Sequence, residues 1–426
     1  MSELAIFLSV GLVVLLALGM PVAFVLGLLT MGGLVIADID PMMFAQRVLA
    51  GTDIYSLLAI PGFVLAGDLM GAGGLSRRLV RFASVLFGHL TGGLSIATVL
   101  AGTFFGAISG SAPATTAAIG SVMIDELERK GYKRSYAAAL ATSVGPLGQL
   151  IPPSIPMVLW GVLAEESIAK LFLAGVIPGL IAAAGFVGVS IWHARRYDVA
   201  RENKASREES WFAVRDGIWA LLAPVIILGG IYGGVFTPTE ASMVGVLYGV
   251  VAGCFIYREL SWRQLYATTL QSLKMSGMIV FIVAMAYGYA YLMANEGIPQ
   301  QVVGLLLSLS DNPVVILLLI NVLLLILGAV MDTASAMVIL VGVLTSLGVH
   351  LGIDPIQLGA MVVVNFAVGM VTPPVGYSLF VASAISGEKI EAITARLGPF
   401  MLVLIVVILL ITYVPALTTW LPGMLY

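Results

Sequence analysis

The sequence has little charge, few histidines and one cysteine. Only 10% of its 426 residues are charged and 60% are hydrophobic, whereas roughly a quarter of a typical soluble domain is charged. The mean hydropathy of +1.07 excludes a soluble globular protein and predicts a chain embedded in lipid. Cys254 has no partner for an internal disulfide, and three scattered histidines form no metal motif.

Motifs for nucleotide binding and hydrolysis are also absent. The sequence contains no GxxxxGK[ST] phosphate loop, no HExxH and no GxSxG. Its apolar stretches hold no paired acids, Cys-His pair or histidine cluster, so we expect no enzymatic activity. It also has no basic tract beyond short clusters, so we expect no nucleic-acid partner. With these functions excluded, we expect a transport protein that is driven by an ion gradient and not by ATP.

The chain is instead rich in long apolar runs. A helical crossing of the bilayer needs about 20 apolar residues, and about ten such crossings fit. The runs are continuously apolar rather than alternating, which favours helices over a β-barrel. The first run, residues 4–18, lacks a basic leader and a cleavage pattern, so we expect it to remain. The predicted fold class is an all-α polytopic membrane protein.

Positive charge predicts the topology. Eighteen of the 20 Lys and Arg residues gather in five clusters, which are expected to be cytoplasmic loops. The clusters are Arg77, Arg78 and Arg81; Arg129, Lys130, Lys133 and Arg134; six residues from Arg195 to Arg215; Arg258, Arg263 and Lys274; and Lys389 and Arg396. The chain then starts and ends in the periplasm. Residues 193–216 become a cytoplasmic linker between two halves, 1–192 and 217–426.

This topology requires two stretches to enter and leave the membrane on the same side. Residues 92–124 carry SGSAPATT in their middle, and residues 312–350 carry MDTAS. We predict two re-entrant hairpins that enter from opposite sides and point at each other. Each is followed by a predicted broken helix, residues 135–164 with IPPSIP and residues 355–386 with VTPPVG.

Landmarks of the first half recur in the second at a nearly constant spacing of 221 to 223 positions. Gly106 recurs as Gly328, Pro152-Pro153 as Pro373-Pro374, Pro178 as Pro399, and Leu69-Met70 as Leu292-Met293. This spacing indicates an internal duplication. Because the topology puts equivalent loops on opposite sides, the repeats are inverted, an arrangement typical of secondary transporters with a site at the repeat interface.

The chemistry is expected where the helices break. Non-helical backbone survives at membrane depth only when it is buried in protein or lines a wet cavity. Its free carbonyls and Ser or Thr hydroxyls suit a hard cation, while helix N-termini favour an anion. Asp332 is the only acid between Asp311 and Asp354; it could ligate the cation, contact substrate or cap a helix. Asp68 and Glu240 lie near predicted span ends and are left out of the site.

Four long motifs carry a family resemblance. They are GTFFGAISGSAPATTAAIGSVMIDELERKGYKRSYAAA, GQLIPPSIPMVLWG, FTPTEASMVGVLYG and GMVTPPVGYSLFVASAI. With them the whole chain resembles the large membrane (M) subunit of tripartite ATP-independent periplasmic (TRAP) transporters. The resemblance implies an elevator-type fold in the inner membrane, sodium coupling, a separate four-helix small membrane (Q) subunit, and a soluble periplasmic (P) protein that captures organic acids. We expect no fused small subunit, because the chain begins with large-subunit helices.

The resemblance also implies site residues. One sodium site is expected near Ser109, Gly110, Gly145, Gly148 and Pro152, and the other near Gly328, Asp332, Gly369 and Thr372. Substrate is expected between the hairpin tips, near Ser111, Thr115, Thr333 and Ser335.

Three other functions stay open at this point. A stand-alone ion-coupled carboxylate carrier of related fold would need no binding protein. A channel would show flux without saturation or coupling, and a membrane enzyme would need catalytic groups. The residues leave the identity of the solute open, from sialic acid and C4-dicarboxylates to keto acids and sugar acids.

Overall fold

The computed structural model describes residues 3–197, 199, 203–310 and 312–426, and this part of the chain contains helices and no strand. Of the predicted linker 193–216, residues 198 and 200–202 lie outside the described residues, as does Asp311. Long helices reach into the described remainder of that segment from both sides, ending at Arg196 and beginning again at Arg207.

The helices fall into two series. The first comprises α1 (Glu3–Ala17), α2 (Val22–Ile36), α3 (Met42–Thr52), a short 3-10 turn (Tyr55–Leu58), α4 (Ala59–Ala72), α5 (Leu75–Phe87), α6 (Gly93–Ser109), α7 (Ala112–Arg129), α8 (Arg134–Val144), α9 (Leu147–Leu150), α10 (Ile155–Leu163) and α11 (Ile168–Arg196). The second comprises α12 (Arg207–Tyr232), α13 (Pro238–Val250) with a π-helical end (Val251–Ile256), α14 (Trp262–Asn295), α15 (Ile298–Leu309), α16 (Pro313–Val330), α17 (Thr333–Leu351), α18 (Pro355–Gly369), α19 (Tyr377–Ser386), α20 (Ile390–Tyr413) and α21 (Ala416–Leu425).

Length and composition confirm an all-α membrane protein. Within the described residues, nine helical segments are long and apolar enough to cross a bilayer, and six shorter apolar helices accompany them. The segment from Arg134 to Leu163 differs from the others because 94% of its most apolar window is buried in protein. Its backbone breaks are therefore enclosed by other helices, which the lack of hydrogen-bonding solvent in lipid requires.

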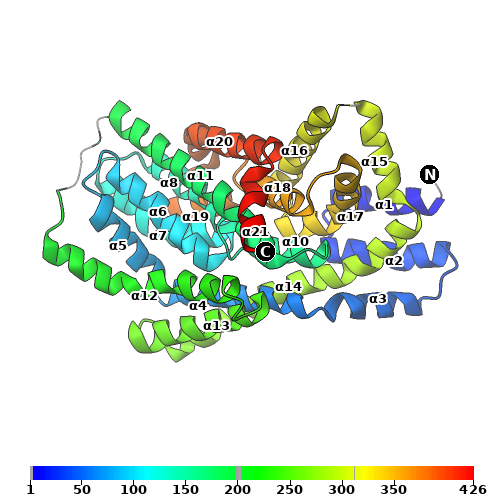
Figure 1. Cartoon of the computed structure of the whole chain (residues 1–426), viewed down its shortest axis with the longest axis horizontal. Coiled ribbons are helices and arrows are strands. Elements are labelled where there is room, and N and C mark those ends of the chain that lie inside the picture. The colour runs from blue at the N-terminus through cyan, green and yellow to red at the C-terminus, as the bar shows by residue number, and fades with distance from the viewer. Residues whose placement is uncertain (1–2, 198, 200–202, 311) are drawn as a thin grey trace.

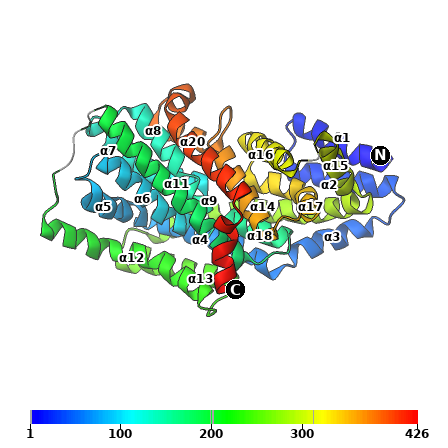
Figure 2. The ribbon, with the colours of Figure 1, turned by 45° about the horizontal axis from the view of Figure 1, so that its top comes forward.

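The molecule is elongated, and its two helical hairpins lie toward opposite ends. Hairpin α6–α7 lies toward one end and hairpin α16–α17 toward the other, with α9 and α18 between them (Figures 1 and 2). The long helix α14 packs along α2, α3 and α4 and also touches α17. Each hairpin contacts the broken helix of its own half, α7 against α8 and α16 against α18.

Local sequence explains why each hairpin turns where it does. Helix α6 ends at Ser109 and is capped by Gly110, whose φ of +63° favours glycine, and α7 begins at Ala112 with a proline in its first turn. Helix α17 starts at Asp332, whose side chain accepts a hydrogen bond from the Ser335 backbone N–H at 3.0 Å. Each tip therefore places a helix end and a helix start side by side.

The broken helices bond to the hairpin tips in the same way in both halves. Each break contains a cis proline pair, Pro152-Pro153 and Pro373-Pro374. Just beyond these pairs, the Ile155 N–H donates to the Gly110 carbonyl at 3.2 Å, and the Gly376 N–H donates to the Ala329 carbonyl at 3.1 Å. These bonds satisfy backbone groups that the breaks would otherwise leave unpaired.

The two halves meet at a pseudo-two-fold axis. Gln149 and Met370 are 221 positions apart, the spacing of the repeat, and the Gln149 amide donates to the Met370 sulfur at 3.3 Å. Equivalent residues of two repeats can touch each other only at the axis that relates them. The axis therefore passes between α9 and the end of α18.

The assignment of positive charges to loops was wrong for residues of two clusters. Lys274 was assigned to a cytoplasmic loop, but it lies inside the 34-residue helix α14. Arg77, Arg78 and Arg81 likewise lie on α5 rather than in a loop, although Arg77 and Arg78 pair with Glu259 at the chain turn before α14.

Candidate functional site

A cavity of about 480 Å³ lies at the pseudo-two-fold axis. It is lined by Gly110, Ser111, Pro113, Gln149, Ile155, Pro156, Leu159, Lys274, Met275, Met278, Ile279, Ile282, Asp332, Thr333, Ala334, Met370 and Tyr377. Both hairpin tips thus face the same space, as the sequence predicted. A cavity of this size suits a small organic solute.

Several residues that line this cavity in one half correspond, at the repeat spacing, to lining residues in the other half. Gly110 and Ser111 correspond to Asp332 and Thr333 at a spacing of 222 positions, and Pro156 corresponds to Tyr377 at 221. The lining includes no counterpart for Pro113, Ile155, Leu159 or Ala334, and none for the wall that α14 contributes from Lys274 to Ile282. The repeat therefore supplies matching positions at the two hairpin tips, while α14 adds a wall from the second half alone.

Four helices direct their N-terminal ends at this cavity. The first residues of α7, α10, α17 and α19 or their N-caps contribute Ser111, Ile155, Asp332 and Tyr377 to its lining. A helix N-terminus carries free N–H groups and the positive end of the helix dipole, so it favours an anion. The converging ends therefore make this cavity favourable for an anion.

The first hairpin tip gathers hydroxyls around the α8–α9 break. The Ser109 and Thr115 hydroxyls are 2.8 Å apart, and the Thr116 hydroxyl is buried without a hydrogen-bond partner in the described residues. An added Cβ on Gly145 would lie 2.4 Å from the Thr116 oxygen, and one on Gly148 would lie 2.3 Å from the Thr115 oxygen. The threonine oxygens therefore rest directly against the glycines of the break.

At the second tip, the backbone of Gly369 in the broken helix packs directly against the backbone of Gly328 in the hairpin. An added Cβ on Gly369 would lie 2.6 Å from the Gly328 Cα atom, so only glycine fits there. The Thr372 hydroxyl donates to the Val368 carbonyl at 2.7 Å. Nearby, the hydroxyls of Thr333 and Ser378 are buried and lack partners within the described part of the chain.

The structure divides the predicted residues into two groups. Gly110, Ser111, Asp332 and Thr333 line the central cavity, whereas the others lie behind its wall. The residues behind it comprise Ser109, Thr115, Gly145, Gly148, Pro152, Gly328, Ser335, Gly369 and Thr372. Of those predicted to contact substrate, Thr115 and Ser335 are thus buried behind the tips: Thr115 bonds to Ser109 and Ser335 lies under the Asp332 cap.

Sequence reasoning missed several residues at this centre. Gln149 and Lys274 line the cavity, and Thr116 and Ser378 present unpaired buried oxygens beside it. One signal was available for Lys274: it is the single charged residue between positions 264 and 295. A charge inside a membrane helix is expensive and usually marks a functional position.

The two acids that were set aside have structural partners. Glu240 closes a capping box with Thr237 at the start of α13. Asp68 on α4 accepts a hydrogen bond from the Ser272 hydroxyl of α14 at 2.6 Å. Neither lines the cavity, so both stay outside the candidate site.

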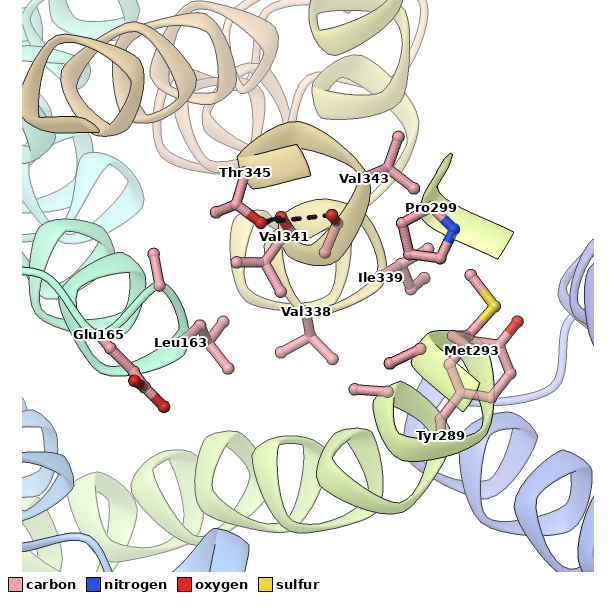
Figure 3. A pocket seen from close by; sticks show the side chains of 14 residues that line it. Leu163, Glu165, Tyr289, Met293, Pro299, Val338, Ile339, Val341, Val343 and Thr345 are labelled. Carbon is pink, nitrogen blue, oxygen red and sulfur yellow. Dashed lines mark hydrogen bonds between the residues drawn. The ribbon is translucent and has the colours of Figure 1, made fainter. Parts of the chain in front are cut away.

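A second cavity of about 300 Å³ lies between the end of α10 and helices α14, α15 and α17 (Figure 3). Its walls are mostly apolar, with Glu165 at the end opposite Tyr289 and Met293 (Figure 3). The hydroxyls of Thr345 and Tyr289 are satisfied by backbone carbonyls. With its hydroxyls already paired, this space lacks the converging polar groups of the central cavity.

Comparison with known proteins gives the family. Residues 9–417 match the family model described as the DctM component of the tripartite ATP-independent periplasmic transporter. The chain belongs to this family. Members named among its relatives are transporter permeases, so the chain is a transport protein and not an enzyme.

Three relatives show how far the similarity extends. The chain is 38% identical over 442 residues to the C4-dicarboxylate TRAP transporter large permease DctM of Rhodobacter capsulatus, covering 100% of both chains. It is 35% identical over 409 residues to the sialic acid large permease SiaM of Vibrio cholerae, covering 96% of each. It is 41% identical over 410 residues to the isethionate permease DctMQ of Oleidesulfovibrio alaskensis, covering 96% of this chain and 65% of that relative.

A solved structure shares the fold. The Alcanivorax borkumensis YdaH transporter, whose crystal structure was described as having an unusual topology, superposes with a TM-score of 0.64 over 98% of both chains. Its sequence is only 15% identical. The similarity therefore concerns the architecture and not the solute.

Proposed function

We propose that this chain imports a small organic acid across the inner membrane, driven by a sodium gradient, after a periplasmic binding protein delivers the acid. The observation that carries the proposal is the central cavity, into which four helix N-termini and both hairpin tips converge. Relatives named for C4-dicarboxylate, sialic acid and 2,3-diketo-L-gulonate transport support an organic acid as solute.

The carboxylate is expected to bind between the tips. Ser111 and Thr333, which correspond to each other in the repeat, are the N-terminal hydroxyl residues of α7 and α17 that line the cavity. Backbone N–H groups at these helix starts and the adjacent hydroxyls can donate hydrogen bonds to carboxylate oxygens. The mostly apolar α14 wall would contact the carbon skeleton.

The residues behind the tips fit sodium. A hard cation prefers oxygen ligands, and each half keeps a buried hydroxyl outside the cavity lining that no group in the described residues pairs: Thr116 in the first half and Ser378 in the second. An unpaired buried hydroxyl costs free energy. A bound sodium ion in each half would satisfy these atoms. Ser109 and Thr115 lie close to Thr116 along the chain and would complete the first site, and Asp332 at the second tip is our proposed ligand for the second site.

The packing supports an elevator movement. Helix α14 packs mainly along α2, α3 and α4. The segments of the broken helices pack instead on both hairpins, α8 and α19 on α7, α18 on α16 and α10 on α17. The hairpins and broken helices can thus move as one body past the α14 group. Binding of sodium behind the tips and acid between them would order both tips before that movement.

Two partners are proposed, a small Q subunit of four helices and a soluble P protein. The isethionate relative carries the letters M and Q in its name and is longer than the region matched here, which covers 65% of it. This supports a small subunit that in other systems is a separate chain. The alternative function is a stand-alone sodium-coupled carboxylate carrier of related fold.

Uptake into proteoliposomes tests the proposal. The vesicles would hold this chain with its Q subunit, and the assay would use labelled succinate, N-acetylneuraminate and isethionate, with or without the binding protein and with inward gradients of sodium or choline. The proposal predicts uptake of at least one solute only when sodium and binding protein are both present.

The other possible results of the uptake assay would favour different functions. Uptake that needs sodium but no binding protein would favour the stand-alone carrier. Flux that needs neither and does not saturate would replace the carrier with a channel. Saturable uptake that is equal in sodium and choline would overturn sodium coupling.

A further inference from the structure

Lys274 is the charged residue of the central cavity that the proposed function has not used. It lies 12 residues beyond the start of α14 at Trp262. At the α-helical rise of about 1.5 Å per residue, this is about 18 Å along the helix. Its side chain is exposed to the cavity, and the described part of the chain offers it no hydrogen bond and no ion pair. A lysine within a helix long and apolar enough to cross a bilayer needs either water or an anionic partner.

The one carboxylate in the cavity wall is already engaged. Asp332 accepts a hydrogen bond from the Ser335 N–H and sits at the positive end of α17. Asp332 and Lys274 do not form an ion pair, although both line the same cavity. The cation of Lys274 is therefore left facing a space that the four helix N-termini also make favourable for anions.

We propose that Lys274 supplies the cationic contact for the anionic group of the transported solute, from the α14 wall of the cavity. This rests on the proposed function, because it assigns a residue to the carboxylate that the cavity would hold. The contact comes from a helix packed on α2, α3 and α4 and not from the hairpins. If the hairpins carry the solute, the contact forms in one position of the movement and breaks in the other.

The position of Lys274 indicates which end of the path it serves. The start of α14 follows the turn that carries Arg258, which the charge pattern places on the cytoplasmic side. From there the α14 wall runs through Met278 to Ile282, away from the start of the helix. Lys274 thus lies at the cytoplasmic end of the cavity, where it would hold the acid just before release.

A first test measures the charge of the cavity without knowing the solute. In a Cys254→Ser background, Met278→Cys places a thiol one helical turn from Lys274 on the same cavity wall. The rates of reaction with an anionic and a cationic methanethiosulfonate reagent are then compared. We expect Lys274→Gln to lower the anionic-to-cationic rate ratio about fivefold, Lys274→Arg to preserve it, and the ratio to respond to salt.

The matched control is Lys389→Gln, which removes an exposed lysine at the start of α20, outside the cavity. It should leave the ratio unchanged. A ratio that stays within twofold in Lys274→Gln would overturn the inference, because the lysine charge would then not act on the cavity.

A second test uses sodium-driven uptake of whichever of succinate, N-acetylneuraminate or isethionate the wild type transports. Lys274→Gln should raise KM about tenfold, and Lys274→Arg should keep it within about threefold of wild type. An unchanged KM in Lys274→Gln overturns the assignment even if the reagent ratio falls. If the wild type shows no sodium-driven uptake, the proposed function fails, and the reagent ratio still decides whether Lys274 makes the cavity favour anions.

Discussion

The two hairpin tips have the same geometry but different chemistry. Both place a helix start at the central cavity, and both receive a backbone hydrogen bond from the segment after a proline pair. The first tip is uncharged and buried, with Ser109, Thr115 and Thr116 packed onto glycines. The second carries the carboxylate of Asp332 exposed to the cavity. The repeat thus preserves backbone paths, while the side chains of each half differ.

This difference indicates that the backbone geometry of a hairpin tip and the charge of its side chains are separate requirements. The close glycine approaches recur in both halves because a break in a membrane helix needs backbone packing to exclude lipid. The ligands need not recur, because an oxygen cage can be built from hydroxyls and carbonyls or from a carboxylate. Substitutions that attack the shared geometry should therefore have larger effects than those that attack the chemistry of one tip.

The largest effect is expected from Gly369→Ala. The added methyl would lie 2.6 Å from the Gly328 Cα atom, and neither backbone can move without opening the tip. We expect loss of transport and a destabilisation of about 3 kcal/mol or more, at the upper end of overpacking costs. Thermal unfolding in detergent and uptake would measure both. Gly398→Ala in α20, where no atom lies within 4 Å of the added Cβ, is the control and should be neutral or slightly stabilising.

Asp332→Ser separates the charge of the second tip from its capping role. Serine can still accept the Ser335 N–H bond, so stability should remain near wild type, while the sodium concentration for half-maximal uptake rises about tenfold or more. Asp332→Ala should raise it similarly and also lose about 1 kcal/mol of stability with the cap. An unchanged sodium dependence in Asp332→Ser would remove the carboxylate from the sodium site and leave it as a helix cap.

Thr116→Val tests the uncharged tip. Valine keeps the shape of the threonine but removes a buried oxygen that has no partner in the described residues. Without sodium the variant should be as stable as wild type or more stable, because an unsatisfied group has been removed. With sodium it should require a severalfold higher concentration for half-maximal uptake. Equal sodium dependence in variant and wild type would show that this hydroxyl is not a ligand.

The smallest effect on transport is expected at a polar network that only the second half contains. The Asn365 amide donates to Asn321 at 2.9 Å, and Asn321 donates to Thr412 at 3.0 Å. At the repeat spacing, the first half has Val99 and Val144 instead of the two asparagines.

Replacing one asparagine should therefore cost more than replacing both. Asn365→Val leaves the Asn321 carbonyl without this donor, which should destabilise the protein by about 1–3 kcal/mol. Adding Asn321→Val should recover part of that loss. Thermal unfolding of the two single variants and the double variant measures the coupling between them. Strictly additive losses would show that the two side chains act independently.

Much of the fold could be predicted because lipid imposes simple rules. Uncharged runs of about 20 residues predicted helices, and Gly-, Ser- and Pro-rich interruptions predicted the tips and breaks. The constant spacing of proline and glycine landmarks predicted the repeat, and Gln149 and Met370, which lie at that spacing, are in contact. These features depend on local composition, which the sequence carries explicitly.

The site was harder to predict, for two physical reasons. Counting positive charges treats each lysine as part of a loop, whereas Lys274 lies inside a helix and lines a cavity. Oxygen cages also depend on which way a hydroxyl points: Thr115 and Thr116 turn toward the broken helix and not toward the cavity. Neither the cavity nor the rotation of α7 can be derived from neighbouring residues alone.

Sodium-dependent stabilisation of the purified wild-type chain tests the central claim most directly. Thermal unfolding would be followed while sodium chloride replaces choline chloride at constant ionic strength, for wild type, Thr116→Val and Asp332→Ser. The account predicts a saturable rise in Tm with sodium for the wild type and a smaller rise in each variant, since a ligand that binds only the folded state stabilises it. Identical unfolding curves in sodium and choline would contradict it.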